Sequence, residues 1–518
     1  MKKTYIDTAM ERIAPDLILK GGNVVDVFSG RVIKADVIIK DGIICGVGSY
    51  SGENEQDVSG KYIMPGFIDS HVHIESSMTQ PSEYAKAVMP HGITTVIADP
   101  HEITNVCGED GLEFMLKSAK NIPLDVNLML PSCVPATPFE HTGANLDAKT
   151  TQKLAPKFFG IGEMMNYPGI VSGDDETLGK LCLDIVDGHA PLLSGHELDA
   201  YASAGIKTDH ECSVIEEMTE KISKGMYILL REGTLSLDVA KLIKGVTPYT
   251  LRRCAFCTDD RFVGEIIRDG SIDHCIRKAV SLGLNNIDAI IMATLNACEI
   301  YGMKNKGAIA PSYVADIVVA DDLNLSSISQ VYKNGKLVCE NGKALFECET
   351  VDNSKVTNTV HLPKISADFF KTDVKDKFDA IELIPESIIT KKVTVSYSDS
   401  LSKVCVIERH HNLGTKGIGF VTNYGITNGA IATSIGHDSH NVIVIGDNDS
   451  DMALAVNTLG TSGGIAVCSE GKVIASMTLD IAGLMSVKSA DEVTREHDNL
   501  YSAAKVLNIT DKIDPFLS

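Results

Sequence analysis

Residues 66–77 read GFIDSHVHIESS and carry two histidines, one residue apart, at the end of an apolar stretch. Residues i and i+2 of a β-strand point to the same face, so His71 and His73 are expected to project together. Two imidazoles aimed at one point can share a metal ion, or they can be two half-buried polar residues at a strand end. The rest of the sequence has to decide between these interpretations.

The region around this segment alternates short apolar segments with helical ones. Sequences such as SEYAKAVMPHG and SVIEEMTEKISKG, which are typical of helices, lie between the apolar segments. Eight such units in about 240 residues predict a (β/α)8 TIM-like barrel of class α/β, whose active site lies at the carboxyl ends of the strands. A doubly wound open sheet is the alternative. The expected strands are 63–73, 94–99, 125–131, 158–164, 184–189, 206–210, 226–231 and 254–259.

Short β-rich runs flank this region on both sides. Runs such as DLILKGGNVV and VYKNGKLV are broken by Gly-Gly and Asn-Gly turns, a pattern typical of antiparallel sheets. We expect the two flanks, residues 1–62 and 305–345, to build one small β-sandwich, with residues 63–304 as the barrel. After a polar, irregular stretch that we interpret as a linker, residues 365–518 are expected to form a separate C-terminal α+β domain.

The bulk composition excludes several classes of function. With 69 acidic and 47 basic residues the net charge is −22, which disfavours a nucleic-acid partner because wrapping a phosphate backbone needs a basic face. No apolar run reaches the length of a membrane span, and MKKTYIDTAMERIAPD lacks the apolar core of a signal peptide. The 13 cysteines are scattered, with one C-x-x-C at Cys254 and Cys257, which fits reduced thiols. We therefore expect a cytoplasmic protein that acts on a small molecule, without a membrane partner.

Polar residues recur at the carboxyl ends of the expected strands. Each of them alone has an ordinary explanation, such as a satisfied loop histidine, a surface carboxylate or a helix N-cap. Barrel geometry would bring all of them to one mouth, where imidazole and carboxylate groups together suit a divalent transition metal. The joint pattern therefore predicts a metal site. Its members are His71 and His73 on the first strand, Glu163 on the fourth, His189 on the fifth, His210 on the sixth and Asp259 on the eighth.

This strand-ordered set, with a β-rich flank on each side, resembles the amidohydrolase superfamily. The phrases PGFIDSHVHIESS, TTVIADPHEI, DGHAPLLSG, TDHE and FCTDDR look closer to the bacterial adenine deaminase family. The resemblance runs nearly end to end and includes the C-terminal segment IATSIGHDSHNVIVIGDND. Many superfamily members bridge their metals with a carbamylated lysine, whereas the fourth-strand position here is Glu163. That difference argues against the hydantoinase and urease branches.

The resemblance implies a binuclear site, with Mn²⁺ as the expected ion and Fe²⁺ or Zn²⁺ as alternatives. The implied reaction is the hydrolysis of adenine to hypoxanthine and ammonia. In it, Asp259 would carry a proton from water to the leaving amine and Glu163 would deliver one to ring N1. Carried over by position, His71, His73 and Asp259 would hold one ion, His189 and His210 the other, and Glu163 would bridge them.

Two alternative functions and one expectation about the assembly accompany this hypothesis. Another binuclear amidohydrolase activity, such as an N-acetyl-sugar deacetylase or a cyclic-amide hydrolase, would use the same ligands. A non-enzymatic assembly protein is the third possibility, although every expected ligand is present. We also expect a homo-oligomer, taken to be a dimer.

Two further motifs, DPHE at residues 99–102 and LLREG at residues 229–233, follow strands near the expected mouth. Under the resemblance, DPHE after the second strand would bind substrate or an auxiliary metal, with loop structure as the other interpretation. Arg231 could contact a ring nitrogen or an interface carboxylate, and Asp260 is expected to point away from Asp259. The C-terminal GHDSHN could fold over the mouth, but we favour a structural role. The residues concerned are Asp99, His101, Glu102, Arg231, Glu232, His437, Asp438 and His440.

Overall fold

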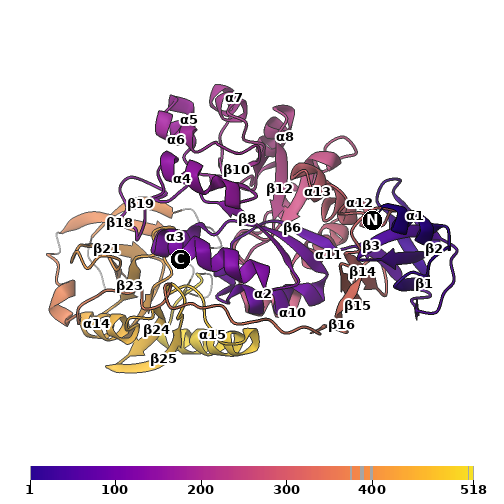
Figure 1. The fold of residues 1–518 in the computed structure, drawn as a ribbon. Coiled ribbons are helices and arrows are strands. Elements are labelled where there is room, and N and C mark those ends of the chain that lie inside the picture. Colours follow the sequence, from indigo (N-terminus) through magenta and orange to yellow (C-terminus); the bar gives the residue numbers. More distant parts are fainter. Residues whose placement is uncertain (1, 374–375, 386–389, 397–400, 511–512, 517–518) are drawn as a thin grey trace.

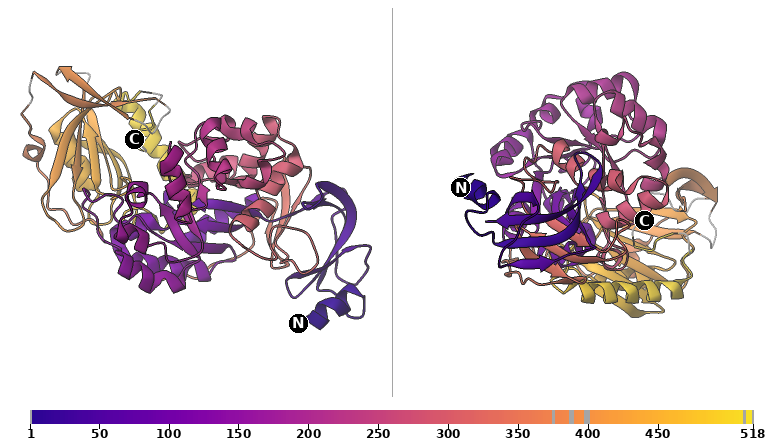
Figure 2. Two further views of the ribbon diagram at one scale, coloured as in Figure 1. Left: turned by 90° about the horizontal axis from the view of Figure 1, so that it is seen from above. Right: turned by 90° about the vertical axis from the view of Figure 1, so that its right-hand side faces the viewer.

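The structure, a computed structural model, describes residues 2–373, 376–385, 390–396, 401–510 and 513–516. The barrel strands and their helices lie in the middle of the molecule (Figure 1). The N-terminal strands lie at one end of it and the C-terminal elements at the other, as the view from above also shows (Figure 2).

Eight parallel strands curl into a TIM-like barrel, and each of them overlaps an expected strand. Five of them pair in the order β10-β9-β8-β7-β6, and three pair in the order β11-β12-β13. The two runs meet at Val72 and Asp259, which form a parallel bridge, and at Lys207, whose backbone N–H donates to Val186 O. The strands are β6 (Phe67–Val72), β7 (Ile93–Ala98), β8 (Asp125–Leu130), β9 (Gly160–Met164), β10 (Val186–Gly188), β11 (Thr208–Asp209), β12 (Tyr227–Arg231) and β13 (Cys254–Cys257).

Helices cover the outside of these strands. Every residue of β6 and β7 is buried, as expected for parallel strands that are covered on both faces. The α-helices are α2 (Pro81–Val88), α3 (His101–Lys120), α4 (Ala148–Leu154), α5 (Tyr167–Ser172), α6 (Asp175–Gly179), α7 (Gly195–Ser203), α8 (Ile215–Ser223), α9 (Val239–Leu242), α10 (Val263–Asp269), α11 (Ile272–Ser281), α12 (Asn286–Met292) and α13 (Leu295–Ile300). The 3-10 turns of this region are η1 (Ile74–Ser77), η2 (Met89–His91), η3 (Ala155–Lys157), η4 (Ile243–Gly245) and η5 (Leu251–Arg253).

The two flanks of the barrel share one nine-stranded sheet, with the order β17-β16-β15-β14-β5-β1-β2-β3 and β4 paired to β1. The N-terminal helix α1 (Lys2–Ala9) precedes it. The strands are β1 (Leu17–Asp26), β2 (Arg31–Lys40), β3 (Ile43–Gly48), β4 (Glu55–Asp57), β5 (Tyr62–Pro65), β14 (Ile317–Ala320), β15 (Ile328–Lys333), β16 (Lys336–Glu340) and β17 (Lys343–Ala344).

The prediction of one barrel strand over residues 63–73 is wrong at its start. Residues up to Pro65 form β5, which hydrogen-bonds to β1 and β14 of the flank sheet. Gly66 separates β5 from β6, and a Cβ at this position would lie only 2.2 Å from Thr94 Oγ1. The chain therefore passes from one sheet to the other at a glycine that leaves room for β7.

The C-terminal elements combine an eight-stranded sheet with helices α14 (Asp449–Thr458) and α15 (Ala490–Ala504) and the 3-10 turns η6 (Ala367–Phe370) and η7 (Lys505–Leu507). The strand order is β19-β18-β21-β20-β23-β22-β24-β25. The strands are β18 (Lys377–Leu383), β19 (Thr390–Ser396), β20 (Ser402–Ile407), β21 (Lys416–Thr422), β22 (Gly429–Thr433), β23 (Val442–Gly446), β24 (Gly464–Ser469) and β25 (Lys472–Thr478).

The stretch that we interpreted as a linker is irregular, but it packs against the rest of the molecule. Val356 and Val360 are buried, and Val356 O accepts a hydrogen bond from Ala482 N. Residues of the C-terminal elements such as Leu484 share a hydrophobic core with Val72 of the barrel. The C-terminal elements are therefore packed onto the barrel rather than tethered to it. None of the described helices is long and apolar enough to cross a membrane.

Candidate metal centre

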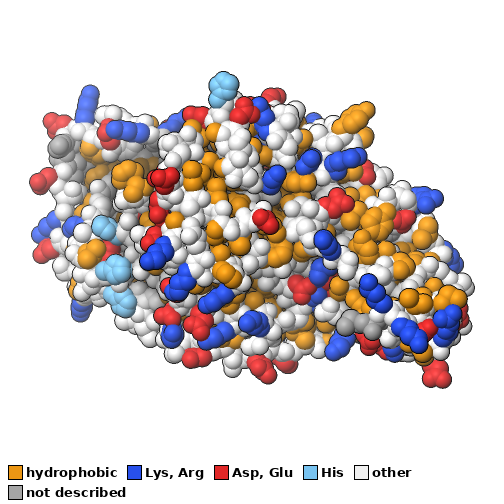
Figure 3. Space-filling model, turned by 45° about the horizontal axis from the view of Figure 1, so that its top comes forward, with side chains coloured by type: hydrophobic (Ala, Val, Ile, Leu, Met, Phe, Trp, Pro, Cys, Tyr) orange, Lys and Arg blue, Asp and Glu red, His pale blue; other side chains and the backbone are white. Residues whose placement is uncertain are grey.

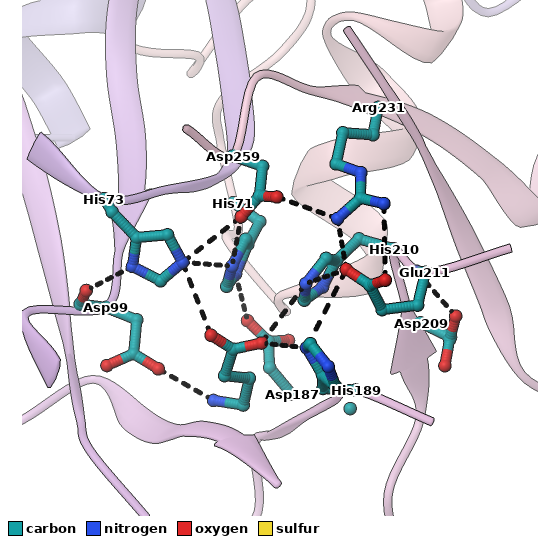
Figure 4. Close-up of polar contacts among 12 residues, drawn as sticks. His71, His73, Asp99, Asp187, His189, Asp209, His210, Glu211, Arg231 and Asp259 are labelled. Atoms are coloured by element: carbon teal, nitrogen blue, oxygen red, sulfur yellow. Dashed lines mark hydrogen bonds and ion pairs between the residues drawn. The ribbon is translucent and has the colours of Figure 1, made fainter. Parts of the chain in front are cut away.

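The ends of β6 and β13 bring three of the expected metal ligands together. His73 N donates to Asp259 O and Asp259 N donates to His71 O, so the two strand ends are locked side by side. The Nε2 atoms of His71 and His73 lie 3.2 Å apart. Asp259 Oδ1 lies 3.5 Å from His71 Nε2 and 3.2 Å from His73 Nε2. Figure 4 shows the three side chains pointing toward one another.

Glu163, at the end of β9, lies between this group and two more imidazoles. Its Oε2 is 2.6 Å from His189 Nδ1 and 3.2 Å from His210 Nε2. Its Oε1 is 3.3 Å from His73 Nε2. Glu163 thus has one oxygen toward each group, and the structure brings all six residues expected at the mouth into one cluster.

The geometry of this cluster fits divalent metal ions. Atoms that share an ion at about 2.1 Å lie about 3.0–3.4 Å from one another, close to the separations found here. His73 Nδ1 donates to Asp99 O at 2.8 Å, so the Nε2 of the neutral ring carries a free lone pair directed into the cluster. Imidazole and carboxylate donors in this combination suit first-row transition metals.

Electrostatics keep both carboxylates of the cluster ionised. Burial raises the pKa of Glu163, but His189, His210 and His73 outweigh that effect and hold this pKa well below its usual value. Burial also raises the pKa of Asp259, but the Arg231 guanidinium and the neighbouring imidazoles again lower it well below its usual value. Two buried carboxylates that stay negative make the cluster a favourable place for cations.

A second set of side chains holds these groups in position. Asp99 Oδ2 accepts a hydrogen bond from Glu163 N at 2.9 Å, and a Cβ on Gly162 would lie 2.2 Å from that same oxygen. Asp187 Oδ2 lies 3.8 Å from His71 Nδ1 and accepts a hydrogen bond from the hydroxyl of Tyr301. Asp99 therefore acts on the cluster through the backbone, and the glycine before Glu163 leaves room for it.

Arg231, at the end of β12, lies among three carboxylates. Its Nη1 donates to Asp259 Oδ2 at 2.9 Å, its Nη2 donates to Glu211 Oε2 at 3.3 Å, and its Nε donates to Asp238 Oδ2 at 3.2 Å. Sequence reasoning missed Glu211 and Asp238, although Glu211 follows His210 directly in the TDHE motif. Glu232, by contrast, pairs with Lys278.

The DPHE motif faces the C-terminal elements. His101 Nδ1 lies 3.3 Å from Glu163 Oε1, so this residue borders the cluster. Glu102 instead contacts His437 and His440 of the segment between β22 and β23. The segment for which we favoured a structural role therefore lies over the barrel mouth.

A cavity of about 650 Å³ opens onto the cluster. The barrel contributes His73, Glu163, Arg231 and other residues to its wall, and the C-terminal elements contribute Ile435 and Leu484. Asp260 also lines the cavity, where it accepts a hydrogen bond from Ser76 Oγ. Asp260 thus lies on the same cavity as Asp259, but its carboxylate contacts Ser76, whereas that of Asp259 faces the imidazoles.

Comparisons with known proteins agree with this arrangement. The amidohydrolase family model matches residues 62–338, and the model of the adenine deaminase C-terminal domain matches residues 383–518. An adenine deaminase of Clostridium acetobutylicum is 46% identical, with 99% of this chain and 94% of that protein covered. An adenine deaminase of Nitratidesulfovibrio vulgaris is 43% identical, with 99% and 93% covered. The chain belongs to the adenine deaminase family of the amidohydrolases.

Proposed function

We propose that this protein hydrolyses adenine to hypoxanthine and ammonia. The observation that carries the proposal is the convergence of four imidazoles and two ionised carboxylates from five strand ends, all but His71 in the wall of one cavity, in a chain of this family. The volume of the cavity, and a largely apolar wall that carries a few convergent polar groups, suit a small heterocycle. On the face shown in Figure 3, basic and acidic side chains are interspersed, which supports a free base rather than a polynucleotide as substrate.

The residues of the cluster divide into two ligand groups in this proposal. His71, His73 and Asp259 would hold one ion and His189 and His210 the other. Glu163 would serve both, because its Oε1 faces His73 and its Oε2 faces His189 and His210. Mn²⁺ is the ion that we propose, with Fe²⁺ or Zn²⁺ as substitutes, because the mixed imidazole and carboxylate set suits all three. When bound, such ions lower the pKa of water toward ~7 and so supply the nucleophile at neutral pH.

The chain's own residues move the protons. Asp259 is ionised and accepts one proton of the attacking water. It then carries this proton to the departing amino group at C6. Arg231 holds Asp259 Oδ2, so that Oδ1 stays toward the imidazoles and the cavity. Ring N1 takes up negative charge as the C6 carbon becomes tetrahedral, and it therefore needs a proton. The attacking water supplies two protons: the ionised Glu163 takes one and delivers it to N1, and Asp259 carries the other to the amino group. Arg231, Glu211 and His101 line the cavity and are our candidates for contacts with the base.

Ammonia release from a panel of substrates tests the proposal. The Mn²⁺-loaded protein is offered adenine, adenosine, other purines, pyrimidines, an acetamido sugar and a cyclic amide, and hypoxanthine is identified by its absorbance. We expect adenine to be the best substrate, with a kcat/KM well above that for adenosine. Comparable kcat/KM for the nucleoside, or turnover of the sugar or the cyclic amide in place of adenine, would contradict the proposal.

We further propose three structural units: the flanks 1–62 and 305–345 as a small β-sandwich, the barrel 63–304 and a C-terminal α+β domain 365–518. The pairing of β5 with β1 and β14 supports moving the first boundary to Gly66. A cytoplasmic setting is supported by the 13 cysteines, all of which are free thiols. A homodimer is proposed as the assembly, and light scattering of the purified protein measures it.

A further inference from the structure

A second cluster of imidazole and carboxylate groups lies beside the first. Glu102 Oε1 is 2.7 Å from His437 Nδ1 and 3.3 Å from His101 Nε2, while its Oε2 contacts His440 Nε2. Asp438 Oδ1 lies 3.8 Å from His101 Nε2. One carboxylate thus faces three imidazoles, two of which come from a segment more than 330 residues further along the chain, since Glu102 and His440 are 338 residues apart.

The burial of this cluster makes its polar atoms costly to leave unsatisfied. The side chains of Glu102, His101 and His440 are at most 3% exposed. Both ring nitrogens of His101 are buried without a hydrogen-bond partner among the described residues. Such orphaned nitrogens cost free energy unless a proton, a water molecule or a cation satisfies them.

His101 is placed to serve as a metal ligand. Its Nε2 faces Glu102, and its Nδ1 lies 3.3 Å from Glu163 Oε1. Histidine ligands of metals typically donate the N–H of the other ring nitrogen to a carboxylate, which fixes the ring and raises the basicity of the ligating nitrogen. With Nδ1 on the side of Glu163, Nε2 is left on the side of Glu102, 3.3 Å from its Oε1 and 3.8 Å from Asp438 Oδ1.

We propose that His101, Glu102, His437 and His440 bind a third divalent transition-metal ion, separate from the two in the six-residue cluster. The donor atoms of Glu102, His437 and His440 lie within 4.8 Å of one another, as do those of His73, His101 and Glu102. Three imidazoles and one carboxylate match the four-coordinate sets that hold Zn²⁺, and they also suit Mn²⁺ and Fe²⁺. The proposal rests on this cluster and not on the identity of the substrate.

The ion would join parts of the chain that are far apart in sequence. Glu102 and His101 begin α3 at the barrel mouth, whereas His437 and His440 belong to the C-terminal elements, and all four line the 650 Å³ cavity. A shared ion would hold the 437–440 segment against the mouth and next to Glu163. The competing arrangement is a metal-free latch, in which His440 Nδ1 accepts from Gly436 N at 3.3 Å and Nε2–H donates to Glu102.

Metal content per chain distinguishes the two arrangements. The wild-type holoenzyme and the variants His437→Gln and His440→Gln are loaded with Mn²⁺ or with Zn²⁺, desalted and analysed by inductively coupled plasma mass spectrometry. We expect three equivalents in the wild type and two in each variant. His497→Gln is the matched control, because His497 is also a buried imidazole of the C-terminal elements on this cavity but forms no ion pair with a carboxylate within the described part of the chain. It is expected to retain three.

Crystals of the wild type provide a test that does not depend on a variant's folding. Anomalous difference density from Mn²⁺-loaded and from Zn²⁺-loaded crystals should show two peaks among the six residues of the first cluster and a third between Glu102 and the two C-terminal histidines. Two equivalents in the wild type with either ion, together with no third peak, would overturn the third site and favour the latch. That outcome would leave adenine turnover untouched, so it is distinct from a failure of the proposed function.

Discussion

At the scale of single residues, Asp259 and Asp260 show how position decides chemistry. Both are adjacent aspartates at the end of β13, but Asp259 has a left-handed backbone (φ of 58°), a conformation that costs of order 1–3 kcal/mol in a non-glycine residue. That turn directs its carboxylate to His71, His73 and Arg231, while Asp260 accepts from Ser76. Local strain is thus retained where it aims a functional group.

The substitution Asp259→Asn tests the proposed proton transfer. In protein verified to hold its metal ions, we expect kcat for adenine to fall by about 10²–10⁴, the range typical of general acid–base groups. The measurement is steady-state kinetics alongside metal analysis of the same sample. Asp260→Asn is the matched control and should cost less, since Asp260 contacts no imidazole of the cluster. Retention of more than about a tenth of wild-type turnover by metal-loaded Asp259→Asn, or the reverse ranking of the two variants, would remove this role from Asp259.

At the scale of elements, helix α15 buries an uncharged histidine against α10. The ring of His497 lies 3.8 Å from that of Phe262 and also contacts Tyr501 and Phe516. Burial, with a smaller contribution from Arg268, lowers the pKa of His497 to about 4. The unfolded chain therefore binds a proton between pH 6.5 and pH 4 that the folded chain does not bind.

This difference predicts how stability depends on pH. In the folded state the pKa of His497 lies below its ordinary value of 6.5, so protonation of this residue in the unfolded chain lowers the free energy of unfolding only below pH 6.5. This loss grows as the pH falls and reaches on the order of 3 kcal/mol near pH 4. His497→Gln should therefore lose less free energy of unfolding than the wild type between pH 7.5 and pH 5. Urea unfolding at the two pH values measures it. His196→Gln, at a fully exposed imidazole, is the control, and equal pH dependence in wild type and His497→Gln would refute the prediction.

At the scale of the whole molecule, the C-terminal elements complete the cavity. Ser486 N donates to Met78 O, directly after η1, and Leu484 lies in the cavity wall with 2% of its surface exposed. Leu484 also belongs to the same hydrophobic core as Val72 of β6. The substrate cavity is therefore a joint product of the barrel and of residues more than 400 positions away.

The substitution Leu484→Arg tests this joint construction. A guanidinium placed in the wall would enter the cavity or remain unpaired in the core, so we expect kcat/KM for adenine to fall at least about tenfold, equivalent to ~1.4 kcal/mol. Val487→Arg is the matched control, because Val487 is 44% exposed and lies outside the cavity wall. Circular dichroism shows whether each variant is folded. A folded Leu484→Arg variant with wild-type kcat/KM would contradict this account of the cavity.

The sequence by itself determined the barrel and the members of its central cluster. Alternation of apolar and helical segments depends on short-range periodicity, and residues at the carboxyl ends of parallel strands must meet at one mouth. The six residues that could therefore be placed together from the sequence are His71, His73, Glu163, His189, His210 and Asp259. The ends of elements were less certain, as β5 shows, because an apolar run does not reveal which of two sheets will pair with it.

Only the tertiary structure decided which side chains surround that cluster. The partners of Arg231, the contact between Asp187 and His71, and the contact of Glu102 with His437 and His440 all join residues from separate elements. No local pattern encodes such contacts, because loops after strands take their course from packing and not from periodicity. The physical reason is that backbone geometry fixes the direction of a side chain within its own strand, whereas its neighbours are fixed by how distant segments bury their apolar surface together.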